Sequence, residues 1–500
     1  MKKIIACLSL LISLLLIWIT GISQVTIGSS LPANNSAILD LQSNSKGFLP
    51  PRMSTPQRIG IASPAAGLVV FDTDVSQLYL FDGIQWQLLS GNSMANSIRP
   101  PQQFQPPAEQ KKNNGFFGVD VAITDNYAVV GAPSADLGAN PSTGAVYVYK
   151  KGDFGGWSEV AKLYASDPQL NSFFGASVAI AGNYIVVGAP LYNVTSTSNA
   201  GKIYVFVKGV GDVWTSQAGF TNPTGFAAND QFGYDVAIST TPSAGPTIIV
   251  GAPYVEGSGS DRGAAYTFRF NGTSWNFQEA FAPLDLANTD KFGYEVNIDG
   301  DYCAVGAPEQ NNGATLDVGA VYVFVYAGPL ILWGQQQKLP GYTTNSRFGY
   351  SMSLKGDLIA VAAPFGLAGG PITNPVYLYQ RTGTTWNFID EVFMNYYQGF
   401  DESNQFGISV SIDNDKILVG MPAGYVTHTG SITGDYLPAY VIVFKKTGNN
   451  FLFYKVINDN EPFNASTVFG NSVSMKNGYY VIGIPGKNSY TGAIAFGYIE

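Results

Sequence analysis

The sequence contains little cysteine, histidine or charge. Its 500 residues include 2 cysteines and 1 histidine, and only 12% of them are charged. Removal of Cys7 with an N-terminal segment leaves Cys303 alone, and a single thiol cannot form an internal disulfide. The fold must therefore be held together by burial and strand pairing. The net charge of −9 argues against a nucleic-acid partner, because phosphate binding needs clustered Lys and Arg.

The scarcity of histidine also limits the chemistry. A Ser-His-Asp or Cys-His arrangement would have to use His428, which lies in a loop rich in Gly and Thr. His428 and Cys303 have no partners at the spacing of zinc ligands. We therefore expect no catalytic residue, no metal site and no cofactor, and we interpret Cys303 as a core residue.

Glycine and aromatic residues are abundant instead. The chain has 57 glycines, and 13% of its residues are aromatic. Short β-branched and aromatic runs are separated by Gly, Asn and Asp turns, which is typical of strands joined by tight turns. The composition predicts an all-β protein.

The N-terminus has the features of an export signal. Lys2 and Lys3 precede an apolar run over residues 4–18, and Gly21 and Ser23 offer a small-x-small cleavage site before Gln24. We expect residues 1–23 to be removed and the mature chain to be secreted or displayed at the cell surface. A periplasmic location and an uncleaved anchor stay open as alternatives.

A repeat with two internal landmarks covers most of the chain. Seven Phe-Gly pairs recur at intervals of 56 to 63 residues and start at Phe117, Phe174, Phe232, Phe292, Phe348, Phe406 and Phe469. A Gly-Ala-Pro sequence or a variant of it starts 13 residues after six of the seven glycines, and in the third repeat it is delayed by five residues. Regular recurrence at this spacing indicates a repeat architecture.

Each repeat is expected to form four strands. In the second repeat the first strand covers residues 177–180, the second residues 184–187, and the third residues 201–207. The fourth begins near a Trp, as at Trp157. Near-continuous apolar runs in the first two strands indicate sheets buried on both faces, as in stacked blades. The seventh repeat ends after its third strand, so we predict that residues 102–110 pair with the C-terminal strand and close the ring.

Phe-Gly followed by Gly-Ala-Pro resembles the FG-GAP repeats of integrin α subunits and bacterial surface proteins. The resemblance covers residues 102–500 and implies a seven-bladed β-propeller of four-stranded blades with a role in adhesion or ligand binding. Some integrin blades carry a calcium motif between their first two strands. Here those turns are short, as at residues 299–301, and calcium needs six to eight oxygen ligands, so calcium binding is not carried over.

Residues 24–91 form a different module. The stretches 37–41, 46–53 and 67–72 resemble a small N-terminal module of Bacteroidetes surface proteins. Alternating residues predict strands joined by turns at 72–76 and 82–83. The resemblance implies an attachment or stalk-like role, and oligomerisation through this module stays open. A polar linker over residues 92–101 separates the module from the propeller.

Two candidate sites have a simpler interpretation. Asp120, Asp235 and Glu295 lie two residues after Phe-Gly, near the expected channel, where acidic groups can act on sugars. Four repeats have serine there, so we favour a polar position that satisfies backbone groups where strands start. The tryptophans that recur near the fourth strands are interpreted as blade packing rather than sugar platforms (Trp157, Trp214, Trp275, Trp333 and Trp386).

Loop length gives the main functional expectation. The loops between second and third strands and between successive repeats share one face, and they are the long and irregular ones. Aromatic residues in these loops are our candidate ligand contacts: Tyr192, Tyr254, Phe365, Tyr425 and Tyr436. We expect a non-enzymatic binding or adhesion protein with a protein or glycan ligand and no membrane span after signal cleavage. A propeller carbohydrate hydrolase or lyase and a purely structural surface component are the alternatives.

Overall fold

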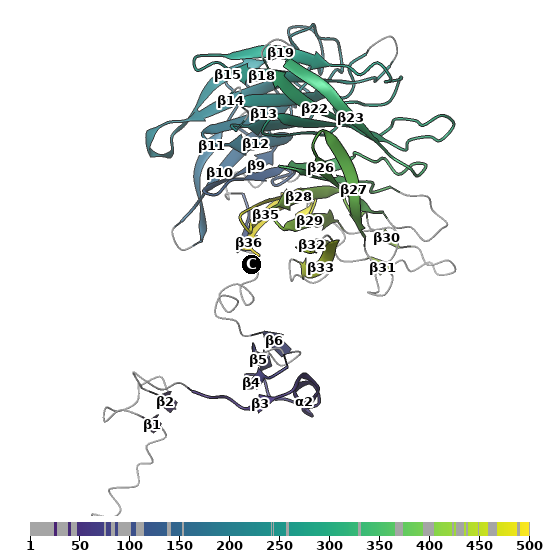
Figure 1. The fold of residues 1–500 in the computed structure, drawn as a ribbon. Coiled ribbons are helices and arrows are strands. Elements are labelled where there is room, and N and C mark those ends of the chain that lie inside the picture. The colour runs from purple at the N-terminus through teal and green to yellow at the C-terminus, as the bar shows by residue number, and fades with distance from the viewer. Residues whose placement is uncertain are drawn as a thin grey trace, which may run out of the picture. The chain divides into compact units, whose positions relative to one another are not determined.

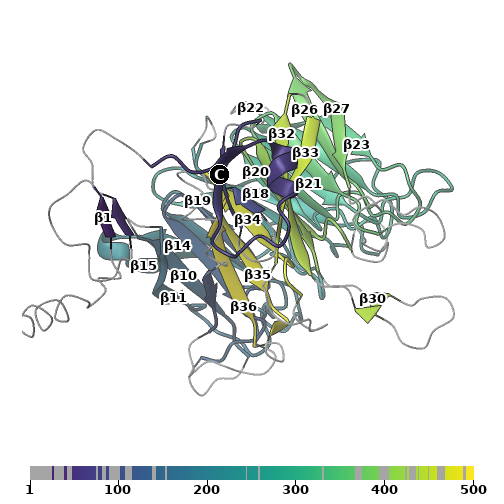
Figure 2. The same ribbon diagram turned by 90° about the horizontal axis from the view of Figure 1, so that it is seen from below.

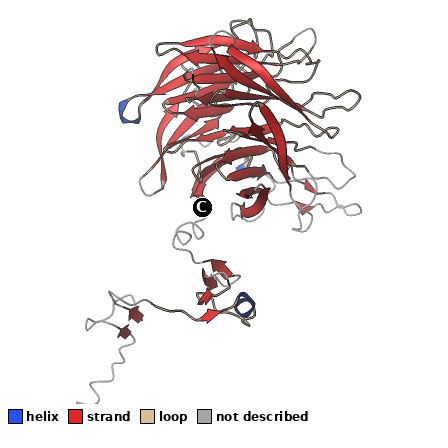
Figure 3. Ribbon diagram, in the orientation of Figure 1, coloured by secondary structure: helices blue, strands red, loops and turns tan. Residues whose placement is uncertain are grey.

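The computed structural model divides the chain into two units, residues 1–97 and residues 98–500. It describes residues 25–27, 39–41, 48–74, 77–81, 86–88, 102–106, 115–137, 142–152, 155–241, 243, 245–256, 260–328, 332–365, 374–393, 405–422, 425–426, 435–436, 439–448, 450–458, 468–487 and 491–499. Its regular structure is almost entirely strand, joined by loops and turns (Figure 3).

The larger unit contains, in its described part, seven four-stranded antiparallel sheets, which we number as blades 1 to 7 (Figure 1). Blade 1 consists of β8 (Val121–Ile123), β9 (Tyr127–Ala132), β10 (Ala145–Lys151) and β11 (Trp157–Leu163). Blade 2 consists of β12 (Ser177–Ala181), β13 (Tyr184–Ala189), β14 (Lys202–Lys208) and β15 (Trp214–Phe220). Blade 3 consists of β16 (Val236–Ser239), β17 (Thr247–Ala252), β18 (Ala264–Phe270) and β19 (Trp275–Phe281). Blade 4 consists of β20 (Val296–Asp299), β21 (Tyr302–Ala307), β22 (Ala320–Gly328) and β23 (Leu332–Pro340). Blade 5 consists of β24 (Ser351–Lys355), β25 (Leu358–Ala362), β26 (Val376–Thr382) and β27 (Thr385–Val392).

Blades 6 and 7 differ slightly in their construction. Blade 6 is β28 (Ser409–Asp413), β29 (Lys416–Met421), β32 (Tyr440–Thr447) and β33 (Asn450–Ile457), and a two-stranded pair, β30 (Tyr425–Val426) and β31 (Asp435–Tyr436), lies between its second and third strands. Blade 7 is β34 (Val473–Lys476), β35 (Tyr479–Ile484), β36 (Ala493–Tyr498) and, as its fourth strand, β7 (Gln102–Phe104).

Strand β7, near the start of the larger unit, pairs with β36, near its end. Phe104 pairs with Ile494 and Gln102 with Phe496 in antiparallel register. The predicted pairing of this segment with the C-terminal strand is therefore confirmed for Gln102–Phe104. The ring of Trp157 in blade 1 stacks on Phe496 in blade 7, with centroids 4.6 Å apart. Blades 1 and 7 are thus packed neighbours, and Figures 1 and 2 show yellow β36 beside blue β10.

The two sequence landmarks form the contacts between blades. Gly131 begins the first Gly-Ala-Pro copy, and a Cβ atom placed there would lie 2.0 Å from the carbonyl oxygen of Gly175, the glycine of the next Phe-Gly pair. Gly175 itself has a φ of +93°, a conformation that favours glycine. The phenylalanine before it, Phe174, is fully buried. The close approach of two blades therefore requires glycine both in the Phe-Gly pair and in the preceding Gly-Ala-Pro, because a side chain at either glycine would separate the blades.

A third landmark was not recognised in the sequence. A glycine with φ between +78° and +92° precedes the third strand in five blades, and it forms a bridge with the next phenylalanine: Gly144, Gly201, Gly263, Gly319 and Gly492. A Cβ at Gly144 would lie 2.1 Å from the carbonyl oxygen of Phe174. These five blades thus carry a second close backbone approach to their neighbours.

The blade interiors agree with the sequence interpretation. The five recurrent tryptophans are 2–8% exposed, as blade packing requires. Cys303 is fully buried on β21, as expected of a core residue. Both faces of the second and third strands are buried, for example along all of β9, because each blade covers its neighbours.

The smaller unit has two short sheets in its described part. Parallel β1 (Val25–Ile27) and β2 (Leu39–Leu41) form one, and β3 (Arg52–Met53), β4 (Val69–Asp72), β5 (Gln77–Phe81) and β6 (Trp86–Leu88) form the other. The strands expected around the two turns are present. The helix α2 (Thr55–Ile59) was not predicted, although Ser54 and Gln57 form a capping box around Pro56.

Candidate functional site

The innermost strands of the propeller carry a regular set of polar side chains that join the blades. The third, fifth and seventh residues after each Phe-Gly phenylalanine point to one side, because side chains alternate along a strand. Many of them accept a hydrogen bond from a backbone N–H of the next blade. We call this set the inner ladder. It gives partners to N–H groups on the open edge of the first strands, where no neighbouring strand can supply them.

The hydrogen bonds of the inner ladder follow one offset throughout. At the third position, Ser472 accepts from Val121, Asp120 from Val178 and Asp235 from Val296, at 2.7–3.1 Å. At the fifth position, Ser474 accepts from Ile123, Asn297 from Leu354, Ser353 from Ile412 and Ser411 from Met475, at 3.0–3.3 Å. At the seventh position, Ser239 accepts from Gly300, Asp299 from Gly356 and Asp413 from Asn477.

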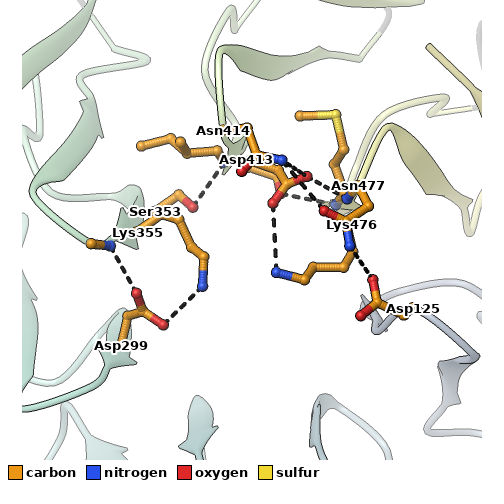
Figure 4. A network of polar contacts seen from close by, with 12 residues as sticks. Asp125, Asp299, Ser353, Lys355, Asp413, Asn414, Lys476 and Asn477 are labelled. Atoms are coloured by element: carbon orange, nitrogen blue, oxygen red, sulfur yellow. Dashed lines mark hydrogen bonds and ion pairs between the residues drawn. The ribbon is translucent and has the colours of Figure 1, made fainter. Parts of the chain in front are cut away.

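The turns between first and second strands continue this network on one face of the propeller (Figure 4). Lys355 donates to Asp299 at 3.0 Å, and Lys476 lies 3.7 Å from Asp413. The side-chain amide of Asn477 in blade 7 donates to Asp125 in blade 1. These turn residues therefore bind neighbouring turns. In the described part of the chain, no group of three or more His, Cys, Asp or Glu side chains is arranged to hold a metal ion.

A cavity of about 460 Å³ lies between the innermost strands and is lined by residues of all seven blades. Asp120, Asp235 and Glu295 face it. Burial raises the pKa of Asp120 to about 6, against the opposing effect of its hydrogen bonds. Burial, with the nearby Asp120 carboxylate, also raises the pKa of Asp235. The pKa of Glu295 is raised by burial and then by Asp235 and Asp120. The three carboxyl groups therefore interact electrostatically within one cavity.

The preferred interpretation of these carboxyl groups is confirmed for two of them. Asp120 and Asp235 each accept the N–H of the following valine and one N–H of the next blade. They satisfy backbone groups where first strands begin and at the same time line the channel.

Five aromatic side chains form a continuous row, and the middle three of them line this cavity. Tyr234, Tyr294 and Tyr350 each follow a Phe-Gly pair in blades 3, 4 and 5, and all three line the cavity. Consecutive rings in this trio are 5.0 Å apart. Tyr254 lies 5.8 Å from Tyr234, and Phe365 lies 5.0 Å from Tyr350. All five are partly exposed, and we call them the aromatic arc.

The arc lies on the long-loop face. Tyr254 and Phe365 directly follow Gly-Ala-Pro or its variant, at the start of loops between second and third strands. The other three rings follow Phe-Gly, where loops between successive blades end. Antiparallel strands bring both loop classes to the same face, so the arc stands where the channel opens among the long loops.

Charged groups surround the two ends of the arc. The Lys291 ammonium lies 5.4 Å from the Tyr254 ring centre, and the Arg347 guanidinium lies 5.2 Å from that of Phe365. Glu309 pairs with both cations, at 2.9 Å from Lys291 and 3.5 Å from Arg347. The rim cations are therefore neutralised in part by Glu309, whereas the carboxyl groups of the cavity have no cationic partner among the ion pairs found in the described residues.

The five predicted ligand contacts separate into three groups. Tyr254 and Phe365 belong to the aromatic arc and form its two ends. Tyr192 is elsewhere, in blade 2, where its hydroxyl donates to Asp167 at 2.7 Å beside Lys202. Tyr425 and Tyr436 pair through their backbones in β30 and β31, and their side chains lie outside the described residues. His428 also lies outside them.

Sequence reasoning missed the centre of the arc. Tyr234, Tyr294 and Tyr350 occupy the residue after Phe-Gly in three consecutive repeats. That recurrence was the available signal, but the other four repeats carry Val119, Ala176, Ile408 and Asn471 there, so the position shows no common chemistry.

Comparison with known proteins agrees with this architecture. Residues 108–149, 157–206, 214–268 and 275–324 match the FG-GAP repeat. Integrin alpha-PS5 of Drosophila melanogaster is 27% identical over 289 residues, which are 53% of this chain and 27% of that protein. Integrin alpha-6 of Gallus gallus is 34% identical over 155 residues, 30% of this chain and 14% of that protein. The resemblance to integrin α is thus confirmed: the larger unit is an integrin-α-like FG-GAP β-propeller, and the chain spans less than a third of either relative's length.

The smaller unit has a match of its own. Residues 26–99 match a phage tail like trimerisation region. Within the part of the chain that the structure describes, no helix combines the length and the apolar character needed to cross a bilayer.

Proposed function

We propose that this is an exported, non-enzymatic binding protein that holds a protein ligand on the long-loop face of its propeller. A cationic side chain of the ligand, Lys or Arg, sits against the aromatic arc at the channel mouth. One observation supports this most directly: three rings of the aromatic arc line the same cavity as three carboxyl groups, and the other two rings contact them. Aromatic faces attract cations by about 0.5–2 kcal/mol each, more when water is excluded.

The carboxyl groups favour the same ligand chemistry. A positive group at the channel mouth would offset the cost of ionising Asp120, Asp235 and Glu295 in a confined cavity. The long loops around the mouth supply a surface on which the rest of a protein ligand can rest. The similarity to integrin α subunits supports a binding role without naming the ligand.

The test is a binding screen of the purified protein against immobilised proteins and Lys- or Arg-containing peptides. We expect specific binding that Tyr294→Ala weakens at least ten-fold. Tyr342→Ala is the matched control, because Tyr342 is 68% exposed and is not part of the arc. Binding that is indifferent to Tyr294→Ala would place the ligand elsewhere and reject the proposal.

A carbohydrate hydrolase is the second candidate, since a carboxyl group with a raised pKa can act as a general acid. Glu295 is the residue to examine, because burial raises its pKa and it shares the cavity with two further carboxyl groups. The same preparation should be assayed against a panel of oligosaccharides. Hydrolysis that Glu295→Gln abolishes would establish this alternative in place of the first.

A further inference from the structure

The face of the propeller opposite the long loops carries lysines at a recurrent position. This short-turn face is formed by the turns between first and second strands and between third and fourth strands. Lys151, Lys208 and Lys446 each stand at the end of the third strand, in blades 1, 2 and 6. At all three positions the backbone N–H donates to a carbonyl of the neighbouring first turn, at 2.7–2.9 Å. The three side chains are partly exposed, so equivalent positions place three cations on this face.

In the described residues, none of these three lysines forms an ion pair with a carboxylate. Their ammonium groups lie near aromatic ring centres instead, Lys151 at 3.8 Å from Tyr479, Lys208 at 5.0 Å from Tyr127 and Lys446 at 5.8 Å from Phe451. The carboxylates that the structure describes on this side of the face are already engaged. The pairs are Asp212–Lys150, Asp413–Lys476, Asp415–Lys416 and Asp125–Asn477 (Figure 4). Blades 6, 7, 1 and 2 therefore present a surplus of positive charge here, although the chain as a whole has a net charge of −9.

Exposed valines project beside the lysines of blades 1 and 2. The turn η2 (Val210–Asp212) leads from the third to the fourth strand of blade 2. Val210 is 96% exposed and Val213 is 57% exposed. Asp212 fixes this turn against blade 1, because its carboxylate accepts a hydrogen bond from the Tyr127 hydroxyl. The Lys208 ammonium lies 3.5 Å from the same hydroxyl, so the apolar tip and the cation are held together.

Blade 6 repeats this combination with other residues. Leu452 on β33 is 53% exposed and is paired with Lys445 in antiparallel register. Residues directly opposite each other in such a pair have their side chains on the same face of the sheet. Lys446 follows at the same end of β32. Single exposed apolar residues are common on protein surfaces, but here exposed aliphatic groups stand beside lysines at two separate places on one face.

We infer that the short-turn face of blades 6, 7, 1 and 2 docks on the anionic, phosphate-bearing headgroups of a lipid bilayer. Lysines are attracted to such a surface, and apolar side chains beside them are stabilised at the boundary between headgroups and acyl chains. A soluble polyanion would attract the lysines but would leave Val210 and Leu452 in water. The long loops lie at the opposite ends of the strands, so docking leaves the aromatic arc accessible. This inference does not depend on what the arc binds.

The test is cosedimentation of the full chain with phosphatidylcholine vesicles that contain either no other lipid or one third phosphatidylglycerol. We expect at least about ten-fold stronger binding to the anionic vesicles, and raised salt should weaken it. The combined variant Lys151→Gln, Lys208→Gln, Lys446→Gln should lower this preference about ten- to hundred-fold. The ratio of the two affinities is compared, because the apolar residues 4–18 are present in every variant and do not distinguish the two lipids.

The matched control removes three positive charges from the other end of the strands, as Lys162→Gln, Lys202→Gln, Lys338→Gln. These lysines lie at the long-loop ends of β11, β14 and β23, so the control should keep the preference for anionic vesicles. An equal loss in the two combined variants would mean that the vesicles respond only to net charge. That result, or a wild type without any preference, would overturn the inference.

A second measurement detects the apolar contact. In a Cys7→Ser background, Val210→Cys is labelled with the environment-sensitive dye nitrobenzoxadiazole, and Cys303 is not labelled because it is fully buried. Anionic vesicles should shift the emission of this label to the blue. The same label at Leu316→Cys, which is 56% exposed in a long loop of blade 4, should not respond. A chain that binds dextran sulfate but not vesicles, or a label at position 210 that stays in water on bound vesicles, would identify a soluble polyanion as the partner and reject the inference.

Discussion

Gly483 in the last blade lies directly against Gly118 in the first. A Cβ atom on Gly483 would come within 2.0 Å of the Gly118 carbonyl oxygen, a distance that no real Cβ atom adopts. The same contact joins Gly131 to Gly175 and Gly188 to Gly233. Blade 5 departs from it, since Ala362 replaces the glycine there. The seventh blade therefore meets the first through the contact that joins most consecutive blades.

Gly483→Ala should destabilise the propeller because the new methyl group forces blades 7 and 1 apart. Overpacking of this kind costs about 1–3 kcal/mol and sometimes more, which thermal or urea unfolding would detect. Gly334→Ala is the control, since nothing lies within 4 Å of a Cβ placed at Gly334 in β23. Equal stability of the two variants would mean that the glycine contact does not limit the approach of the blades.

Ser411→Ala should destabilise blade 6 against blade 7. The Ser411 hydroxyl accepts the Met475 N–H at 3.0 Å in a buried position, and its loss leaves that donor unpaired at a cost of about 1–3 kcal/mol. Chemical denaturation would give the difference. Ser216→Ala, at an exposed site of β15, serves as control and should change stability by less than about 0.5 kcal/mol. A change in stability no larger than that for Ser411→Ala would show that water can take the place of the Ser411 hydroxyl as the partner of the Met475 N–H.

Stability should fall as the pH rises from 4 to 6, in part because of Asp120. Its pKa is about 6 in the folded chain against an ordinary value of 3.8. Between these values the folded chain holds a proton that the unfolded chain releases, so the free energy of unfolding decreases with pH. Asp120→Asn should lessen this decrease by about 1–3 kcal/mol, since one pKa unit corresponds to 1.36 kcal/mol.

The slope, not the absolute stability, is the quantity to compare for Asp120→Asn. The substitution also alters hydrogen bonds to Val121 and Val178, and that loss is present at every pH. Urea unfolding at several pH values from 4 to 7 separates the two effects. An unchanged slope would show that Asp120 titrates normally and is better hydrated than its position in the cavity indicates.

Binding of a cationic ligand at the aromatic arc should strengthen as the pH rises from 5 to 7. Asp120 ionises near pH 6, and each additional carboxylate in the cavity attracts the ligand cation. Titration calorimetry in buffers of different ionisation enthalpy should detect proton release on binding, because the cation lowers the pKa of the cavity carboxyl groups. Affinity that falls with pH would point to an anionic ligand held by Lys291 and Arg347 instead.

The sequence by itself determined the repeat, the number of strands in each blade and the role of residues 102–104. The Phe174-Gly175 landmark was recognisable in the sequence because the backbone contact between blades allows only glycine at that point. The same residue type therefore recurs at a fixed place in the repeats. The buried tryptophans and Cys303 were also recognisable, because burial in a repeat recurs at one position. Helix α2 was missed, since its single turn has a capping box but no apolar periodicity.

Only the tertiary structure decided the site. Tyr234, Tyr294 and Tyr350 belong to three different repeats, and their contacts arise when adjacent blades meet around the channel. The same holds for Asp120 and Val178, which are 58 residues apart in sequence and joined across a blade boundary. Tyr192 resembled Tyr254 in its loop position, yet Asp167 and Lys202 hold it within blade 2. Local sequence fixes a strand and its turn, whereas the neighbours of a side chain depend on how separate blades pack.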